Sequence, residues 1–350
     1  MSNVVSIGLP KRPNLTQRQG ALLRVFAMHR RSPQDVFWLK ENAELLNILA
    51  TGGAEIAAQD LEVYRGFYDT LEERMRFFPQ YYRFLLSICL DLEALGLEGD
   101  KGAALCATAQ RLDLPAGELS DLQRAEAERL IARRLGSTTL DAGLNARLRA
   151  FMDHCDTFAL PNKKAAYELT HIVFYLSDYG ATPLDLTEDA VTSLEYAGLL
   201  AFLDQDVDLL AEVCVALRFA GQTPSGIWEN WLAREAAEFT LMPAPDGPVT
   251  DAYHEYFVTS WWAGLSGISG FCATPPAGGV QVSRNNAVRG PLRALSELMY
   301  QLGPARSPDW DQMRGLFHRS IATEHQHILD DAALSSHRFN TFFEGFARAY

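Results

Sequence analysis

Residues 33–50 read PQDVFWLKENAELLNILA, and residues 79–95 read PQYYRFLLSICLDLEAL. Both segments open on proline, which suits the first turn of a helix because no hydrogen bond from its nitrogen is needed there. Both also end close to glycine, a common helix terminator. Apolar residues recur every three or four positions between these ends, with the period of an amphipathic helix. The two segments therefore predict two long helices.

Similar periodicity continues through most of the chain. We expect further helices over residues 59–74, 101–112, 117–135, 141–157, 162–179, 188–204, 207–220, 223–240, 250–266, 291–302, 309–331 and 335–348. Residues 279–283 (GVQVS) alternate like a strand, and we interpret them as loop. The sequence predicts an all-α fold of many antiparallel helical hairpins, arranged as an α/α toroid-like ring or a large irregular helical bundle.

The predicted domain organisation is simple. We expect a flexible tail over residues 1–13, followed by a single helical unit over residues 14–350. Composition shifts near the middle of the chain, from Leu, Arg and Glu toward aromatic residues and Gly, without a visible linker. The unit could therefore consist of two halves, residues 14–150 and 151–350.

Charge and cysteine content exclude several classes of protein. The 350 residues include 44 acidic and 31 basic side chains, which gives a formal net charge of −13. Duplex binding needs a basic surface, so we expect no nucleic-acid partner. The longest uncharged stretch, residues 256–283, is too rich in Gly and Pro for a membrane span. The five cysteines form no CxxC pair and the N-terminus lacks a signal peptide, so we predict a cytoplasmic protein without a membrane partner.

One predicted helix carries a polar stripe on an otherwise apolar surface. In residues 167–180 (YELTHIVFYLSDYG), a helical projection places Glu168, His171, Tyr175 and Asp178 within an arc of about 80°. A helix that is apolar almost all round is usually buried, and buried charges need partners. The stripe therefore predicts either a functional site or a structural hydrogen-bond network.

The Glu168-x-x-His171 spacing occurs a second time, as Glu324-x-x-His327. Residues three apart lie on one helix face and can bind one metal ion together. Two such pairs, with a Glu from each of two other helices, form the di-iron site of carboxylate bundles. Glu212 is a candidate for one of those further ligands. The alternative is that the second pair lies on a solvated helix end.

His254 is a third candidate metal ligand or general base. It follows Asp251 by one helical turn, and a carboxylate at that spacing could orient the imidazole. Asp251 is also expected in the first turn of a helix, where acidic residues are common because they complement the helix dipole.

A long loop follows the helix that contains His254. Residues 264–291 include many glycines, which permit close backbone approach, and a loop of this length often binds a ligand. Arg284 and Arg289, with Arg293 on the next helix, could bind a small anionic ligand. The alternative is an exposed connection whose arginines pair with acidic side chains.

Three segments resemble an uncharacterised bacterial family of alphaproteobacterial type. They are residues 35–49 (DVFWLKENAELLNIL), 77–96 (FFPQYYRFLLSICLDLEALG) and 167–180. The resemblance covers most of the chain and implies an all-helical protein of this length. It carries no activity and no catalytic residues that could be transferred to this chain.

Two hypotheses about function follow. The first is an enzyme with a buried helical cleft, metal-dependent or acid/base, that acts on a small anionic molecule and uses iron or another divalent metal. Its catalytic residues would be His171, Asp178 and Tyr175. Its metal ligands would come from Glu168, His171, Glu212, His254, Glu324 and His327. Non-haem iron oxidation is the more specific version. The alternative is a non-catalytic α-helical binding or scaffold protein whose buried polar residues only specify packing; its oligomeric state is left open.

Overall fold

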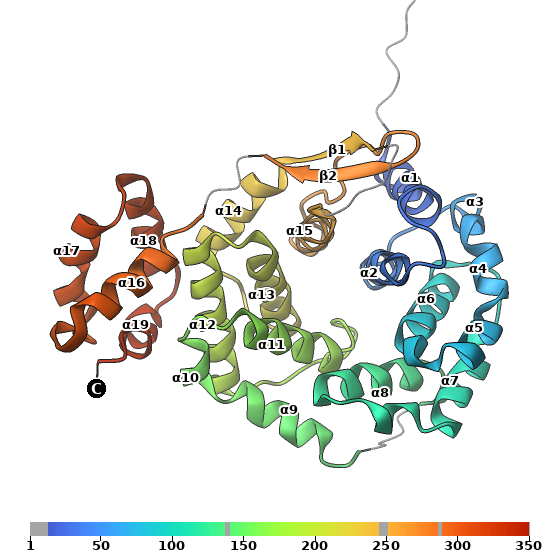
Figure 1. Cartoon of the computed structure of the whole chain (residues 1–350), viewed down its shortest axis with the longest axis horizontal. Coiled ribbons are helices and arrows are strands. Elements are labelled where there is room, and N and C mark those ends of the chain that lie inside the picture. The colour runs from blue at the N-terminus through green and yellow to red at the C-terminus, as the bar shows by residue number, and fades with distance from the viewer. Residues whose placement is uncertain (1–12, 137–140, 245–250, 286–288, 350) are drawn as a thin grey trace, which may run out of the picture.

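Helices form nearly all of the regular structure in the computed structural model (Figure 1), which confirms the predicted all-α fold class. The structure describes residues 13–136, 141–244, 251–285 and 289–349. The predicted tail lies almost wholly outside these residues. No helix in the described ranges is both long enough and apolar enough to cross a membrane.

An inner ring of helices organises the molecule (Figure 1). Each of its members packs against the next, and the last packs back against the first, so that the ring is closed. The members are α2 (Val36–Thr51), α6 (Tyr82–Leu95), α8 (Asp121–Leu135), α11 (Lys163–Leu176), α13 (Val207–Phe219) and α15 (Tyr253–Leu265). The predicted α/α toroid-like arrangement is therefore confirmed.

An outer layer surrounds the ring, because helices alternate along the chain between inner and outer positions (Figure 1). The outer segments are α1 (Leu15–Met28), α3 (Ala58–Leu61), η1 (Glu62–Tyr64), α4 (Arg65–Asp69), α5 (Leu71–Phe77), α7 (Lys101–Arg111), α9 (Leu144–Met152), α10 (Cys155–Phe158), α12 (Glu188–Asp204) and α14 (Gly226–Ala236). Short 3₁₀ turns, η2 (Pro79–Tyr81) and η3 (Leu114–Gly117), precede α6 and α8. Inner helices are thus enclosed on both sides, and α13 is buried from Val207 through Leu217.

A group of C-terminal helices lies outside the ring against α12 and α14 (Figure 1). It consists of α16 (Leu292–Leu302), η4 (Gly303–Ala305), α17 (Trp310–Ser320), α18 (Thr323–Ser335) and α19 (Phe339–Ala347). The group has an aromatic core of its own, in which the Trp310 ring packs 5.1 Å from the rings of Phe339 and Phe343.

A two-stranded antiparallel sheet covers one side of the ring (Figure 1). β1 (Phe239–Pro243) and β2 (Val280–Arg284) pair antiparallel, with Phe239 opposite Arg284. The interpretation of residues 279–283 as loop is therefore wrong, as is the helix predicted to continue to residue 240. Each strand is too short to be recognised alone, because its partner lies about 40 residues away in the sequence.

A buried arginine joins this sheet to the ring. The Arg30 side chain is fully buried and donates hydrogen bonds to Glu41 of α2 at 2.9 Å, to Asp251 at 2.8 Å and to the Val280 carbonyl at 2.8 Å. Asp251 in turn accepts a hydrogen bond from the Val282 amide. The expected pairing of Asp251 with His254 is thus replaced by a structural role.

Replacing Arg30 with methionine should destabilise the protein strongly. Two buried carboxylates would lose their main cation, and breaking a buried ion pair typically costs about 3–5 kcal/mol. Urea unfolding followed by circular dichroism measures the change. Arg293→Met is the matched control, because its exposed pair with Glu297 should leave the free energy of unfolding nearly unchanged. Equal stability of the two variants would contradict the anchoring role.

Candidate functional site

The inner helices enclose a cavity of about 230 Å³ at the centre of the ring. All six contribute to its wall. The charged and imidazole side chains that line it are Lys40, Glu44, Arg83, Glu126, His171, Glu212 and His254. Aromatic and aliphatic side chains complete the wall, among them Ile48, Phe174, Val258 and Trp261.

Two acidic side chains enter this region from α13. The helix begins at the N-cap Asp206, whose side chain accepts from the Leu209 amide, as predicted. Asp208 and Glu212 follow, one helical turn apart and therefore on one face. They are only 9% and 2% exposed, on a helix whose other buried residues are apolar or small. Burial of carboxylates at this depth requires a compensating partner.

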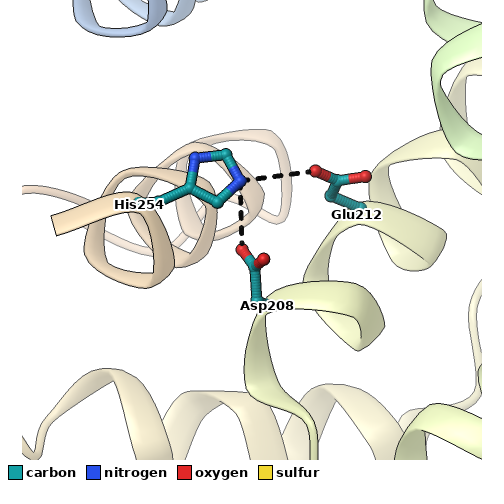
Figure 2. A group of neighbouring side chains, drawn as sticks. All are labelled: Asp208, Glu212 and His254. Atoms are coloured by element: carbon teal, nitrogen blue, oxygen red, sulfur yellow. Dashed lines mark ion pairs between the residues drawn. The ribbon is translucent and has the colours of Figure 1, made fainter. Parts of the chain in front are cut away.

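His254 of α15 lies between the two carboxylates (Figure 2). Its Nε2 is 3.5 Å from Asp208 Oδ1 and 3.7 Å from Glu212 Oε1. On the other side of the ring, Nδ1 is 3.4 Å from Glu44 Oε2. The two Nε2 distances exceed the usual length of a hydrogen bond. One ligand atom from each of Asp208, Glu212 and His254 nevertheless lies within 4.8 Å of the other two, which suits shared coordination of an ion.

Each carboxylate has one oxygen held by a hydroxyl group. The Tyr167 hydroxyl donates to Asp208 Oδ2 at 2.8 Å, and the Thr170 hydroxyl donates to Glu212 Oε2 at 2.6 Å. The second oxygen of Asp208, Oδ1, is buried and has no hydrogen-bond partner among the described residues. Donors on α11 thus orient the carboxylates, and one oxygen remains free toward His254.

The three groups perturb one another's proton affinity. Burial, together with the charge of Glu212, raises the pKa of Asp208 to about 7, although His254 opposes the shift. Burial also disfavours the charged form of Glu212, but His171 and His254 outweigh it, so the pKa of Glu212 is lowered.

Burial alone would favour the neutral form of His254. The neighbouring carboxylates of Glu212, Glu44 and Asp208 outweigh it, so the pKa of His254 is raised well above its ordinary value. Because the folded state then binds the proton more tightly, the resulting stabilisation is complete below the unfolded pKa of about 6.5. It is lost as the pH rises through the folded pKa.

His171 borders the same cluster. Its Nδ1 lies 2.8 Å from the Tyr167 carbonyl oxygen and 3.6 Å from Glu212 Oε2. A carbonyl can only accept, so Nδ1 carries the proton. In the neutral ring Nε2 then holds a lone pair, which suits a general base or a metal ligand.

Of the rest of the predicted polar stripe, Tyr175 meets His171, with ring centroids 6.0 Å apart, and Glu168 and Asp178 do not. Glu168 lies 3.9 Å from Lys164 on the outside of α11. Helix α11 ends at Leu176, three residues before the predicted end, because Asp178 adopts a left-handed conformation with φ 46°. Asp178 instead pairs with Arg129 at 2.6 Å. Tyr175 does line the cavity, and burial raises its pKa well above the ordinary value.

The other predicted site residues lie elsewhere. Glu324 and His327 belong to α18, outside the ring, so the two ExxH pairs do not come together. Arg284 pairs with Glu235 at 2.8 Å and Glu255 at 3.2 Å. Arg293 is exposed and pairs with Glu297, and Arg289 is also exposed. None of these five residues lines the central cavity among its described members.

Glu44 and Asp208 were not recognised as site residues from the sequence. Asp208 carried a usable signal, because Asp208 and Glu212 are spaced by four in the apolar segment VDLLAEVCVAL. Like residues 167–180, this segment places charged side chains on one face of an otherwise apolar helix. Glu44 carried no such signal, since its helix has other polar positions.

Fold and site define an all-α toroidal protein with a polar cavity at its centre. The chain belongs to the family described as Domain of unknown function (DUF6902), whose model matches residues 1–349. This agrees with the expected membership of an uncharacterised family. Comparison with curated proteins and with solved structures gives no significant match.

Replacing Glu44 with glutamine should lower the pKa of His254. The substitution removes the negative charge nearest to Nδ1, and with it one of the interactions that favour imidazolium. Long-range ¹H–¹⁵N NMR titration of metal-free protein in chelator follows each imidazole separately. His327, exposed on α18, is the internal control and should titrate alike in both proteins. An unchanged His254 pKa would contradict the geometry.

Proposed function

We propose that the protein is an enzyme that binds one divalent metal ion at the edge of its central cavity, through Glu212 and His254 of the cavity wall and the adjacent Asp208. The observation that carries this proposal is the buried Oδ1 of Asp208, which has no hydrogen-bond partner among the described residues and lies 3.5 Å from His254 Nε2. A free carboxylate oxygen inside a protein is costly. A cation bound by this oxygen, His254 Nε2 and Glu212 Oε1 would remove that cost. It would also explain why Nε2 lies 3.5 Å and 3.7 Å from the two carboxylates, which is too long for direct hydrogen bonds.

The surrounding residues support the same assignment. Glu44, next to Nδ1, would accept the imidazole proton and leave Nε2 free to coordinate, as outer carboxylates do for metal-bound histidines. Tyr167 and Thr170 would orient the two carboxylates. A donor set of two carboxylates and one imidazole suits Fe²⁺, Mn²⁺ or Zn²⁺, which accept both donor types.

His171 would act beside the metal as general base. Its protonated Nδ1 is fixed by a backbone carbonyl, so the basic Nε2 remains available for a substrate or a water molecule. The proposed reaction class is metal-assisted acid–base chemistry at one ion. A di-iron reaction finds no support, because Glu324 and His327 lie outside the ring.

The proposed substrate is a small molecule with an anionic or oxygen-bearing group. Lys40 and Arg83 are the cationic side chains of the cavity wall, but Lys40 lies 3.7 Å from Glu44 and Arg83 pairs with Glu118 and Glu126, so a bound metal ion would supply the additional positive charge. These two residues replace Arg284, Arg289 and Arg293 as the proposed anchors. We also propose a bacterial, cytoplasmic protein, which the five free cysteines support.

A metal-free binding protein is the second candidate. The raised pKa of His254 favours it, since an imidazolium ion would itself balance the adjacent carboxylates. In that case the cluster would serve packing or ligand binding without catalysis. The two candidates differ in whether the cavity takes up metal.

The metal content of purified protein separates the candidates. After loading with Fe²⁺, Mn²⁺ or Zn²⁺ and desalting, we expect one bound metal ion per wild-type chain by inductively coupled plasma mass spectrometry. Asp208→Asn and His254→Ala should each lose it, because each variant removes a proposed ligand. His327→Ala, a change of the same kind on exposed α18, should retain it. Wild-type protein without metal, or equal loss in all three variants, would overturn the proposal.

Asp208→Asn should stabilise the metal-free protein at pH 8. A raised carboxyl pKa means that ionisation of Asp208 costs folding free energy above its unfolded pKa of about 3.9, and asparagine removes this cost. Thermal unfolding in chelator measures it. Adding metal at a hundredfold excess over its Kd should stabilise only the wild type, by about 2.7 kcal/mol. A less stable Asp208→Asn variant in chelator would show that the carboxylate already has a partner.

A further inference from the structure

A second, larger hollow lies beyond the central cavity. It has a volume of about 700 Å³ and is bordered by the ends of α2 and α15, the start of α1 and the loop that follows α15. The loop is the first part of the long segment for which the sequence predicts ligand binding. We call this hollow the distal groove.

The distal groove and the central cavity are neighbours along the ring axis. Ile48 and Trp261 are the two described residues that line both. On α2, Glu44 is followed one turn later by Ile48, and on α15, His254 is followed by Val258 and Trp261. Seven residues of helix separate His254 from Trp261, a rise of about 10 Å. The wall therefore changes from charged to apolar in the direction of the groove.

The lining of the distal groove is nearly uncharged. Among its described members, Glu55 is the one ionisable side chain, and the others are mainly aliphatic, aromatic or glycine. A groove of this kind favours an apolar group over a charged one. It could hold a hydrocarbon chain but offers no cation for a carboxylate.

The loop is built to leave this space open. A Cβ on Gly270 would lie 2.2 Å from the Ser260 carbonyl oxygen, so only glycine lets the loop pack this closely on α15. Gly267 adopts φ 74°, which also favours glycine. Trp261 is 6% exposed, and its Nε1 has no hydrogen-bond partner among the described residues.

We propose that the distal groove binds the apolar tail of an amphiphilic carboxylate whose head group occupies the central cavity. The proposal rests on the proposed function for the position of the head group. The tail would pass between Ile48 and Trp261, so ligands longer than about 10 Å reach the groove and shorter ones do not. The substrate class is accordingly a carboxylic acid with an extended aliphatic chain.

The test compares chain lengths in a variant that fills the groove. A Cβ on Gly264 meets no atom within 4 Å, and the residue lies on α15 without a positive φ, so Gly264→Phe should fold and place its ring in the groove. Gly66→Phe is the matched control, because Gly66 is exposed on α4 and its Cβ also meets no atom within 4 Å. Ile268→Lys, which places a charge at the 46% exposed rim residue, is a second variant in case the first fails to fold.

Isothermal titration calorimetry with butanoate, octanoate and dodecanoate supplies the readout, in chelator and with added Mn²⁺. In wild type and Gly66→Phe, affinity should rise by about fourfold per methylene between octanoate and dodecanoate. Gly264→Phe and Ile268→Lys should lose this rise while binding butanoate as wild type does. The same chain-length dependence in all four proteins, or no binding of dodecanoate to wild type, would overturn the proposal. If the wild-type protein takes up no metal and its affinity still rises with chain length in chelator, the result supports tail binding in the groove and contradicts only the metal site.

Discussion

The interior of the ring contains more negative charge than a protein core can hold without compensation. Asp208 and Glu212 are buried on α13, Glu44 approaches from α2, and His254 lies between them. Closure of the inner helices into a ring forces these groups together, and no single helix could do so. The His254 imidazole, whose pKa is raised well above its ordinary value by these carboxylates, compensates part of that charge, and the metal ion proposed above would compensate it instead.

The rest of the structure keeps this cluster in place. The hydroxyl groups of Tyr167 and Thr170 on α11 donate hydrogen bonds to Asp208 and Glu212 and so orient the two carboxylates. Arg30 joins the two-stranded sheet to α2 through the Val280 carbonyl and Glu41, and it also pairs with Asp251, which lies just before α15. The position of His254 therefore depends on a salt bridge formed by residues distant in sequence. Helices α2 and α15 lie side by side so that Glu44 and His254 meet at the central cavity, and Ile48 and Trp261 meet further along. The wall is therefore charged at the central cavity and apolar toward the distal groove.

Several features of the site were predictable and others were not. Spacing in an apolar helix identified His171, and the same reasoning would have found Asp208 with Glu212. Projection on an ideal helix failed for Asp178, because the chain leaves the helix at Leu176 and the side chain turns to Arg129. Repetition of Glu-x-x-His suggested two metal-binding helices, yet α18 lies outside the ring. Local spacing says which residues share a face and nothing about which faces meet.

The sequence by itself determined the all-α class and the position of most helices, because apolar periodicity, proline starts and glycine ends act within a few residues. It missed α1 (Leu15–Met28), and it predicted single helices over 59–74, 141–157 and 309–331 where the structure has two or more shorter elements. Only the tertiary structure decided the partners of His254, the pairing of two strands about 40 residues apart and the exclusion of α18 from the centre. These depend on which helix faces close against one another. Such contacts join residues far apart in the chain, so the local pattern of apolar and polar residues does not indicate that they lie close together.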